Sequence, residues 1–304
     1  MSDPRPASPV VRALMTRAVD YAGLFPPARL DMADAVRAYA EYRASPDAWA
    51  LGRFVVPASR LEEFEDSAAA FLPTSAAASW ALSALLSADI ELDAASVDAF
   101  NERHRDCRRG AVHVDTVELR AAQPDEVRRA EPYVGGRFDT FVEIPVHDDP
   151  APLVDAIAAI GAKAKIRTGG VTPDAFPGAR HVVRFIRACL DRGVSFKATA
   201  GLHHPIRAEY RLTYDAGAPR GTMYGFLNVF LAAAFMRRGL DDADALALLD
   251  ERDPAAFAFT DEDVRWHGHA VSLSDVHAAR EEIVSFGSCS FREPVDELQG
   301  LGLL

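Results

Sequence analysis

The sequence predicts an α/β fold, a (β/α)8 barrel of the TIM type, on three observations. Short apolar runs alternate with longer helical patterns over most of the 304 residues, which favours a parallel sheet with right-handed crossovers. Six clear strand–helix units and two weaker strands at this length favour a barrel over a doubly wound sheet. No GxGxxG or GxxxxGK(S/T) motif follows a strand, so the sequence lacks the mark of a dinucleotide-binding or P-loop fold.

The strands and helices are expected at definite places along the chain. The clear strands are 51–57, 80–86, 112–118, 140–145, 162–168 and 194–200, and the weaker ones are 257–260 and 286–291. Helical patterns cover 61–71, 94–105, 150–160, 179–192, 222–238 and 274–285, and another helix covers 31–43. Because the last two strands are weak, we expect the end of the barrel to be irregular.

We expect a single barrel domain, residues 1–304, in which residues 1–50 form an N-terminal extension whose helix leads into the first strand. No Pro/Ser-rich linker or internal repeat divides the sequence. Barrel helices run from the C-terminal rim back to the bottom, so segment 20–27 is expected at the rim, where barrel active sites lie. The competing interpretation is an ordinary turn, because this segment contains Gly23 and Pro26-Pro27.

The composition argues against several classes of function. The chain has 45 acidic and 33 basic residues and a net charge of −12, so neither a nucleic acid nor an acidic membrane is expected as a partner. Three cysteines at unpaired spacings imply no disulfide framework. The N-terminus lacks the pattern of a signal peptide, and the longest apolar stretch, 223–236, is too short to span a bilayer. We therefore expect a cytoplasmic protein.

The lysines are few and lie close together in the sequence. Only three of the 33 basic residues are lysines, and Lys163, Lys165 and Lys197 all lie within 35 residues. A coding bias towards arginine accounts for the scarcity but not for the positions. Of the two residues only lysine loses its proton readily, so a lysine retained against such a bias suggests proton or carbonyl chemistry.

The alternation of strand side chains predicts which residues share the barrel interior. Lys163, Lys165 and Arg167 lie on one face of their strand, Lys197 faces inward from the next strand, and Glu143 from the preceding one. Thr199 shares the inward face with Lys197. Two neighbouring lysines lower each other's pKa and burial lowers it further, so Lys165 or Lys197 is expected to act as a general base or to form a Schiff base.

The remaining members of this group receive supporting roles. We expect Glu143 to move the proton and Arg167 to hold a carboxylate or phosphate. Lys163 lies deepest and is expected only in an interior ion pair. Which of the other two lysines reacts is left open.

Two further stretches are candidates for substrate binding. His203 and His204 follow the strand of Lys197 and precede 206–221, a long polar stretch that is expected to be a lid. Small residues precede a helix that begins near Glu293, so backbone amides there are expected to bind an anion; the candidates are Gly287, Ser288 and Ser290. Cys289 has no histidine beside it in the sequence and is expected to be a small buried residue.

A metal site is the second possibility for this chain. His267 and His269 have the spacing that places two imidazoles on one side of a strand, and Glu143 with His203 or His204 would complete the ligands. An exposed polar loop is the competing interpretation of the 267–269 stretch. His113 and Asp115 also alternate on a strand and are candidates to reach the interior.

The inward lysines on neighbouring strands resemble those of Schiff-base aldolases, and the Lys163–Lys165 pair resembles the base lysines of enolase-like enzymes. Each resemblance covers a few residues, and no residue role is taken from either.

Three hypotheses of function follow. The first is a lyase or isomerase without a cofactor, acting on a small anionic carbonyl or hydroxy-acid compound through the lysines. The second is a hydrolase or lyase that depends on a divalent metal, and the third is a barrel that binds a ligand without catalysis. The expected partner is a small anionic metabolite, and a homo-oligomer is left open.

Overall fold

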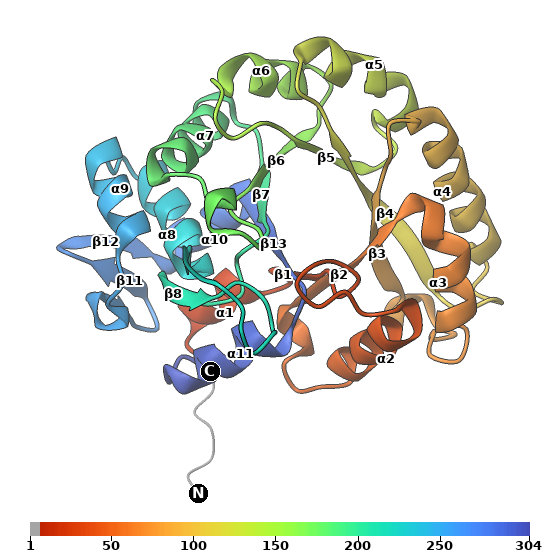
Figure 1. The fold of residues 1–304 in the computed structure, drawn as a ribbon, viewed down its shortest axis with the longest axis horizontal. Coiled ribbons are helices and arrows are strands. Elements are labelled where there is room, and N and C mark those ends of the chain that lie inside the picture. The colour runs from red at the N-terminus through yellow and green to blue at the C-terminus, as the bar shows by residue number, and fades with distance from the viewer. Residues whose placement is uncertain (1–6) are drawn as a thin grey trace, which may run out of the picture.

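A computed structural model describes residues 7–304 and contains a closed barrel of eight parallel strands (Figure 1). Every neighbouring pair of strands in the barrel is parallel. In barrel order the strands are β1 (Val19–Tyr21), β2 (Leu51–Pro57), β3 (Trp80–Leu85), β4 (Val112–Arg120), β5 (Asp139–Glu143), β6 (Lys163–Arg167), β7 (Phe196–Thr199) and β13 (Ile283–Ser288). The prediction of a (β/α)8 barrel is confirmed.

The helices form a ring outside the strands (Figure 1). The six that follow β1 to β6 are α2 (Met32–Arg43), α3 (Leu61–Ala68), α4 (Ile90–His104), α5 (Pro124–Val134), α6 (Ala151–Ala159) and α7 (Ala179–Arg192). The others are α1 (Pro9–Met15), α8 (Phe226–Arg237), α9 (Asp242–Asp250), α10 (Leu273–Glu282) and α11 (Arg292–Gly300). Local chemistry sets several ends: the Asp31 carboxylate accepts the Asp34 amide at the start of α2, and Gly193 ends α7 in the left-handed region.

The first barrel strand lies earlier than the sequence predicted. Leu51 was expected to begin the first strand, but β1 comes before it and pairs with both β2 and β13. Strand β1 has only three residues, all buried, and is too short to give an alternation pattern. Residues 7–50 are therefore not an extension leading into the first strand: helix α2 is the first helix of the barrel repeat, and α1 packs against α10. Residues 1–6 of the predicted extension lie outside the described residues.

The last part of the barrel also differs from the prediction. Stretch 257–260 was expected to be a barrel strand but forms β10 (Phe257–Phe259), which belongs to a separate antiparallel sheet with β11 (Asp263–Trp266) and β12 (His269–Ser272). Strand β13 begins and ends three residues before the predicted stretch 286–291. The polar stretch 206–221 contains most of a hairpin of β8 (Ala208–Arg211) and β9 (Arg220–Met223).

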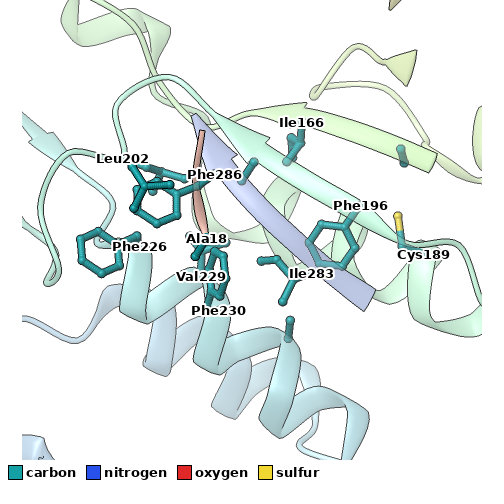
Figure 2. Packing of buried hydrophobic residues seen from close by; sticks show 14 of the residues in the cluster. Ala18, Ile166, Cys189, Phe196, Leu202, Phe226, Val229, Phe230, Ile283 and Phe286 are labelled. Atoms are coloured by element: carbon teal, nitrogen blue, oxygen red, sulfur yellow. The ribbon is translucent and has the colours of Figure 1, made fainter. Parts of the chain in front are cut away.

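Helix α8 is buried on every side, because it lies between the barrel and helices α7, α9 and α10. The Phe226 ring stacks on the Phe286 ring of β13 with a centroid distance of 4.8 Å, and the Phe230 ring meets the Phe286 ring edge-on (Figure 2). Phe286 faces the helices, so its neighbours Ser285 and Gly287 face the barrel interior. No helix in residues 7–304 is long and apolar enough to cross a membrane.

Candidate active site

A cavity of about 320 Å³ opens at the C-terminal ends of the barrel strands. The charged residues at its rim are the last residues of three neighbouring strands, Arg120 of β4, Glu143 of β5 and Arg167 of β6. Its apolar part comes from the rim segment, with Phe25, Pro26 and Pro27, and from the β8–β9 hairpin, with Leu212 and Met223. The prediction that segment 20–27 lies at the rim is confirmed, because Ala22 also lines this cavity.

A chain of alternating charges crosses the floor of the cavity. Lys197 Nζ lies 2.6 Å from Asp20 Oδ2 and 2.8 Å from Glu118 Oε1. Lys165 Nζ lies 2.6 Å from the other oxygen of Glu118 and 2.9 Å from Glu143 Oε2. Lys165 and Lys197 are register partners on β6 and β7, and both face the cavity. Glu118 is thus shared between the two lysines.

Two hydroxyls and an aromatic ring complete the floor. Ser83 donates to Glu118 Oε1 at 2.6 Å, and Ser285 donates to Asp20 Oδ2 at 2.7 Å. The Phe141 ring lies 5.2 Å from Lys197 Nζ. Both buried carboxylates therefore have a hydroxyl donor as well as a cation, which offsets the cost of burying them.

The pKa of Lys197 moves in the direction opposite to the one the sequence suggested. Burial alone would lower the pKa of Lys197, but Asp20 and Glu118 outweigh it and raise the pKa above its usual value. Burial alone would raise the pKa of Glu118, but Lys165 and Lys197 hold it well below its usual range. The raised pKa favours the charged form of Lys197, which lies between the two carboxylates, so the expected neutral amine stays a prediction for Lys165.

The arginines at the rim differ in their partners. Arg120 Nε lies 3.0 Å from Glu143 Oε1. Arg167 is exposed, lines the cavity, and has no carboxylate within 4.0 Å among residues 7–304. An exposed guanidinium without an ionic partner at a cavity is suited to hold an anion. Thr199, the last residue of β7, also lines the cavity and directs its hydroxyl to the Ile166 carbonyl at 3.4 Å.

The deeper charges form a separate layer at the bottom of the barrel. Lys163 Nζ lies 2.9 Å from Asp139 Oδ1, and the Arg53 guanidinium contacts both Asp115 and Asp139. Lys163 is thus in an ion pair, as predicted, but the pair is partly exposed to solvent rather than interior, and Lys163 does not line the cavity. His113 contacts Ser79 at this exposed end, away from the rim.

Sequence alternation missed Glu118, and a β-bulge explains why. The register of β4 against β3 shifts after Leu82: Val114 pairs with Leu82, but Thr116 pairs with Ser83. Alternation continued from Asp115 would point Val117 inward. The bulge instead moves Thr116, Glu118 and Arg120 to the interior. Asp20 was missed as a charged partner because β1 itself was missed.

The adjacent residues His203 and His204 have different surroundings. His203 lines the cavity, where Ser288 Oγ and Cys289 Sγ lie 3.3 Å and 3.8 Å from its Nδ1. The His204 ring stacks on Tyr210 of β8 with a centroid distance of 3.4 Å, and its Nδ1 lies 2.6 Å from Glu297 Oε1. His204 therefore fastens the hairpin to α11.

The Gly–Ser turn after β13 is only partly at the cavity. Gly287 lines it, whereas Ser288 donates its hydroxyl to the Ser290 carbonyl at 2.6 Å. The Ser290 hydroxyl accepts the Glu293 amide at 3.2 Å, so it serves the first turn of α11. The role of this turn in holding an anion stays a prediction.

The residues of the predicted metal site do not come together. His267 and Gly268 form the turn between β11 and β12 with positive φ angles of 43° and 85°, so the two histidines do not alternate along one strand. His267 contacts Glu251, and His269 contacts Asp244. Within the described part of the chain no group of three or more His, Cys, Asp or Glu side chains is arranged to hold a metal. Glu143 and His203 or His204 therefore do not join His267 and His269 in a metal site, contrary to the metal hypothesis.

Comparison with protein-family models gives no match for this sequence, and comparison with curated proteins gives none either. Function is therefore inferred from the chemistry of the cavity.

Proposed function

We propose that the chain is a lyase or isomerase that acts on a small anionic carbonyl compound, with Lys165 as the reacting amine. The observation that carries the proposal is the position of Lys165: it lines the cavity, and its Nζ lies 2.6 Å from Glu118 of β4 and 2.9 Å from Glu143 of the neighbouring β5. A proton leaving its Nζ has an acceptor in place. Lys197 is less suited to react, because it is only 1% exposed and its pKa is raised.

Glu143 is the better acceptor for the Lys165 proton. Glu118 is occupied by both lysines and by Ser83. Glu143 Oε2 is buried and, although Lys165 Nζ lies 2.9 Å away, it makes no well-aligned hydrogen bond with any described residue. That oxygen has a lone pair available to take up a proton and return it.

The chemical steps follow from this pair. Lys165 transfers one proton to Glu143 and its neutral amine attacks the carbonyl carbon, forming a C–N bond. The carbonyl oxygen takes up the Glu143 proton and a second proton from nitrogen and leaves as water, giving a protonated Schiff base. This cation draws in the electron pair of the adjacent C–H bond, whose proton passes to Glu143, or of the adjacent C–C bond, in which case Glu143 accepts the hydroxyl proton of the departing fragment. Glu143 returns the proton to the resulting enamine, and water hydrolyses the Schiff base to release the product and Lys165. In a non-covalent variant the Lys165 amine itself removes the proton next to the carbonyl.

The cavity favours a compact substrate with one anionic end. Its volume of about 320 Å³ suits a small metabolite. Arg167 has no carboxylate partner among residues 7–304 and is suited to hold the anionic end. The apolar rim, with Phe25, Leu212 and Met223, would cover the remainder and exclude water.

Borohydride trapping tests the proposal. The protein is mixed with each of a panel of small 2-oxo acids, aldehydes and phosphorylated aldehydes, reduced, and examined by intact mass and peptide mapping. We expect an adduct at Lys165 in the wild-type protein and in Lys163→Arg, whose changed residue lies in the bottom layer. No adduct with any compound, and no deuterium exchange next to the carbonyl of any compound, would contradict both variants of the mechanism.

Replacing Arg167 by alanine is expected to weaken substrate binding rather than the chemical step. A charge-assisted hydrogen bond contributes about 1.5–3 kcal/mol, so KM should rise by about 10–100-fold while kcat changes little. The measurement is the steady-state kinetics of whichever panel compound the wild-type protein turns over. A fall in kcat at unchanged KM would show that Arg167 does not hold the ground-state anion.

A further inference from the structure

A second cluster of reactive groups lines the wall of the cavity beside the charged floor. Cys289, just after β13, and His203, in the loop after β7, both line the cavity, with Sγ and Nδ1 3.8 Å apart. Glu293 of α11 places Oε2 3.4 Å from the same Nδ1. The hydroxyl of Tyr214, in the hairpin loop, lies 3.4 Å from Cys289 Sγ and donates to Glu293 Oε2 at 2.8 Å. We call these four residues the thiol cluster.

The thiol cluster was not visible in the sequence. Cys289 was expected to be a small buried residue because no histidine stands near it, but the fold brings His203 from 86 positions away. Cys289 is 5% exposed, and it lines the cavity. A thiol next to an imidazole at a cavity is the arrangement found at nucleophilic cysteines.

The neighbours of His203 favour the protonated form of its imidazole. Burial alone would lower the pKa of His203, but its contacts with Cys289 and Glu293 raise it to about 10. Glu293 keeps its charge, because contacts with His203 and Tyr214 outweigh burial and lower its pKa. An imidazolium at 3.8 Å from Cys289 Sγ would stabilise a thiolate there and would carry a proton to give away.

We propose that Cys289 is a nucleophilic thiolate site in the cavity and that small hydroperoxides oxidise it to a sulfenic acid. The thiolate sulfur attacks one oxygen of the peroxide, so that an S–O bond forms while the O–O bond breaks. Sulfur is oxidised by two electrons, and the leaving oxygen is reduced. His203 gives its proton to that oxygen, which departs as water or an alcohol.

The other two cysteines serve as internal controls. Cys107 is the more accessible thiol, being half-buried, whereas Cys189 is buried and burial raises its pKa. The full chain is treated with hydrogen peroxide and dimedone at pH 7 without any substrate, and the rate of labelling is mapped for each cysteine. We expect Cys289 to be labelled fastest, although accessibility alone would favour Cys107. Faster labelling of Cys107 would overturn the proposal.

Two variants test the roles within the cluster. His203→Gln is expected to slow the labelling of Cys289 at least about tenfold, because an unassisted thiol is only a few per cent ionised near pH 7. Cys189 must stay unlabelled in this variant, which reports that the fold is intact. If His203→Gln disturbs the fold, the exposed Tyr214→Phe change takes its place. It is expected to slow the labelling severalfold, because Glu293 loses the hydrogen bond that holds it beside His203. Unchanged labelling in the folded variant tested would contradict the proposal. The labelling rate of Cys289 does not depend on Lys165, so a negative labelling result is distinct from failure of the proposed reaction at Lys165.

Discussion

Replacing Lys197 by methionine is expected to destabilise the folded chain by about 3–5 kcal/mol, the usual cost of removing one partner from a buried ion pair. Methionine has nearly the length of lysine, so the change removes a charge and leaves little empty space. Asp20 and Glu118 would then lie in the barrel without the cation that joins them, and both are buried. Urea unfolding followed by tryptophan fluorescence measures the loss.

The pH dependence of this effect identifies its electrostatic origin. The depressed pKa of Glu118 contributes stability that is present above about pH 4.3 and is lost as pH falls. The raised pKa of Lys197 contributes stability that is present below about pH 10.4 and is lost as pH rises through its folded-state pKa. A carboxylate without its cation is easier to protonate, so the destabilisation should be larger at pH 8 than at pH 5.

Lys163→Met is the matched control for this experiment. It removes the same type of side chain from the same barrel, but Lys163 and Asp139 form a solvated pair. Such a pair contributes about 0–1 kcal/mol. Equal losses for the two variants, or a Lys197→Met loss that is independent of pH, would show that the floor charges do not hold the barrel together.

Strand alternation predicted the cavity floor where strands are regular and missed it where they are not. Strands β5, β6 and β7 keep their alternation, so Glu143, Lys165 and Lys197 meet as predicted. On β4 one bulge reverses the inward face and brings in Glu118, the carboxylate that both lysines share. A bulge depends on how a strand pairs with its neighbour, and this sequence carries no local sign of it.

At the two ends of the barrel, the sequence also failed to place strands whose position depends on their pairing partners. Strand β1 has three residues and depends on β2 and β13 on either side, so its pattern is too short to recognise. Stretch 257–260 has the composition of a strand and does form one, but in a sheet outside the barrel. Composition indicates that a strand forms, whereas its pairing partners decide where it lies.

Replacing Lys165 by arginine is expected to abolish the borohydride-trapped adduct and to lower turnover by about 10²–10⁴-fold, the contribution typical of a positioned acid–base group. Arginine keeps the positive charge beside Glu118 and Glu143 but does not lose its proton at any accessible pH. The free energy of unfolding should therefore change little. The measurements are adduct mass, deuterium exchange next to the substrate carbonyl, and urea unfolding.

Two further lysine variants decide what a loss of activity means. Lys163→Arg changes the same strand two residues away, in the bottom layer, and should keep the wild-type rate. Lys197→Arg keeps the charge between Asp20 and Glu118, so a moderate loss there would reflect displaced carboxylates. If the adduct persists in Lys165→Arg and disappears in Lys197→Arg, Lys197 is the reacting amine. If both arginine variants keep the wild-type rate, neither lysine transfers a proton or forms a Schiff base, and the cavity performs no lysine chemistry.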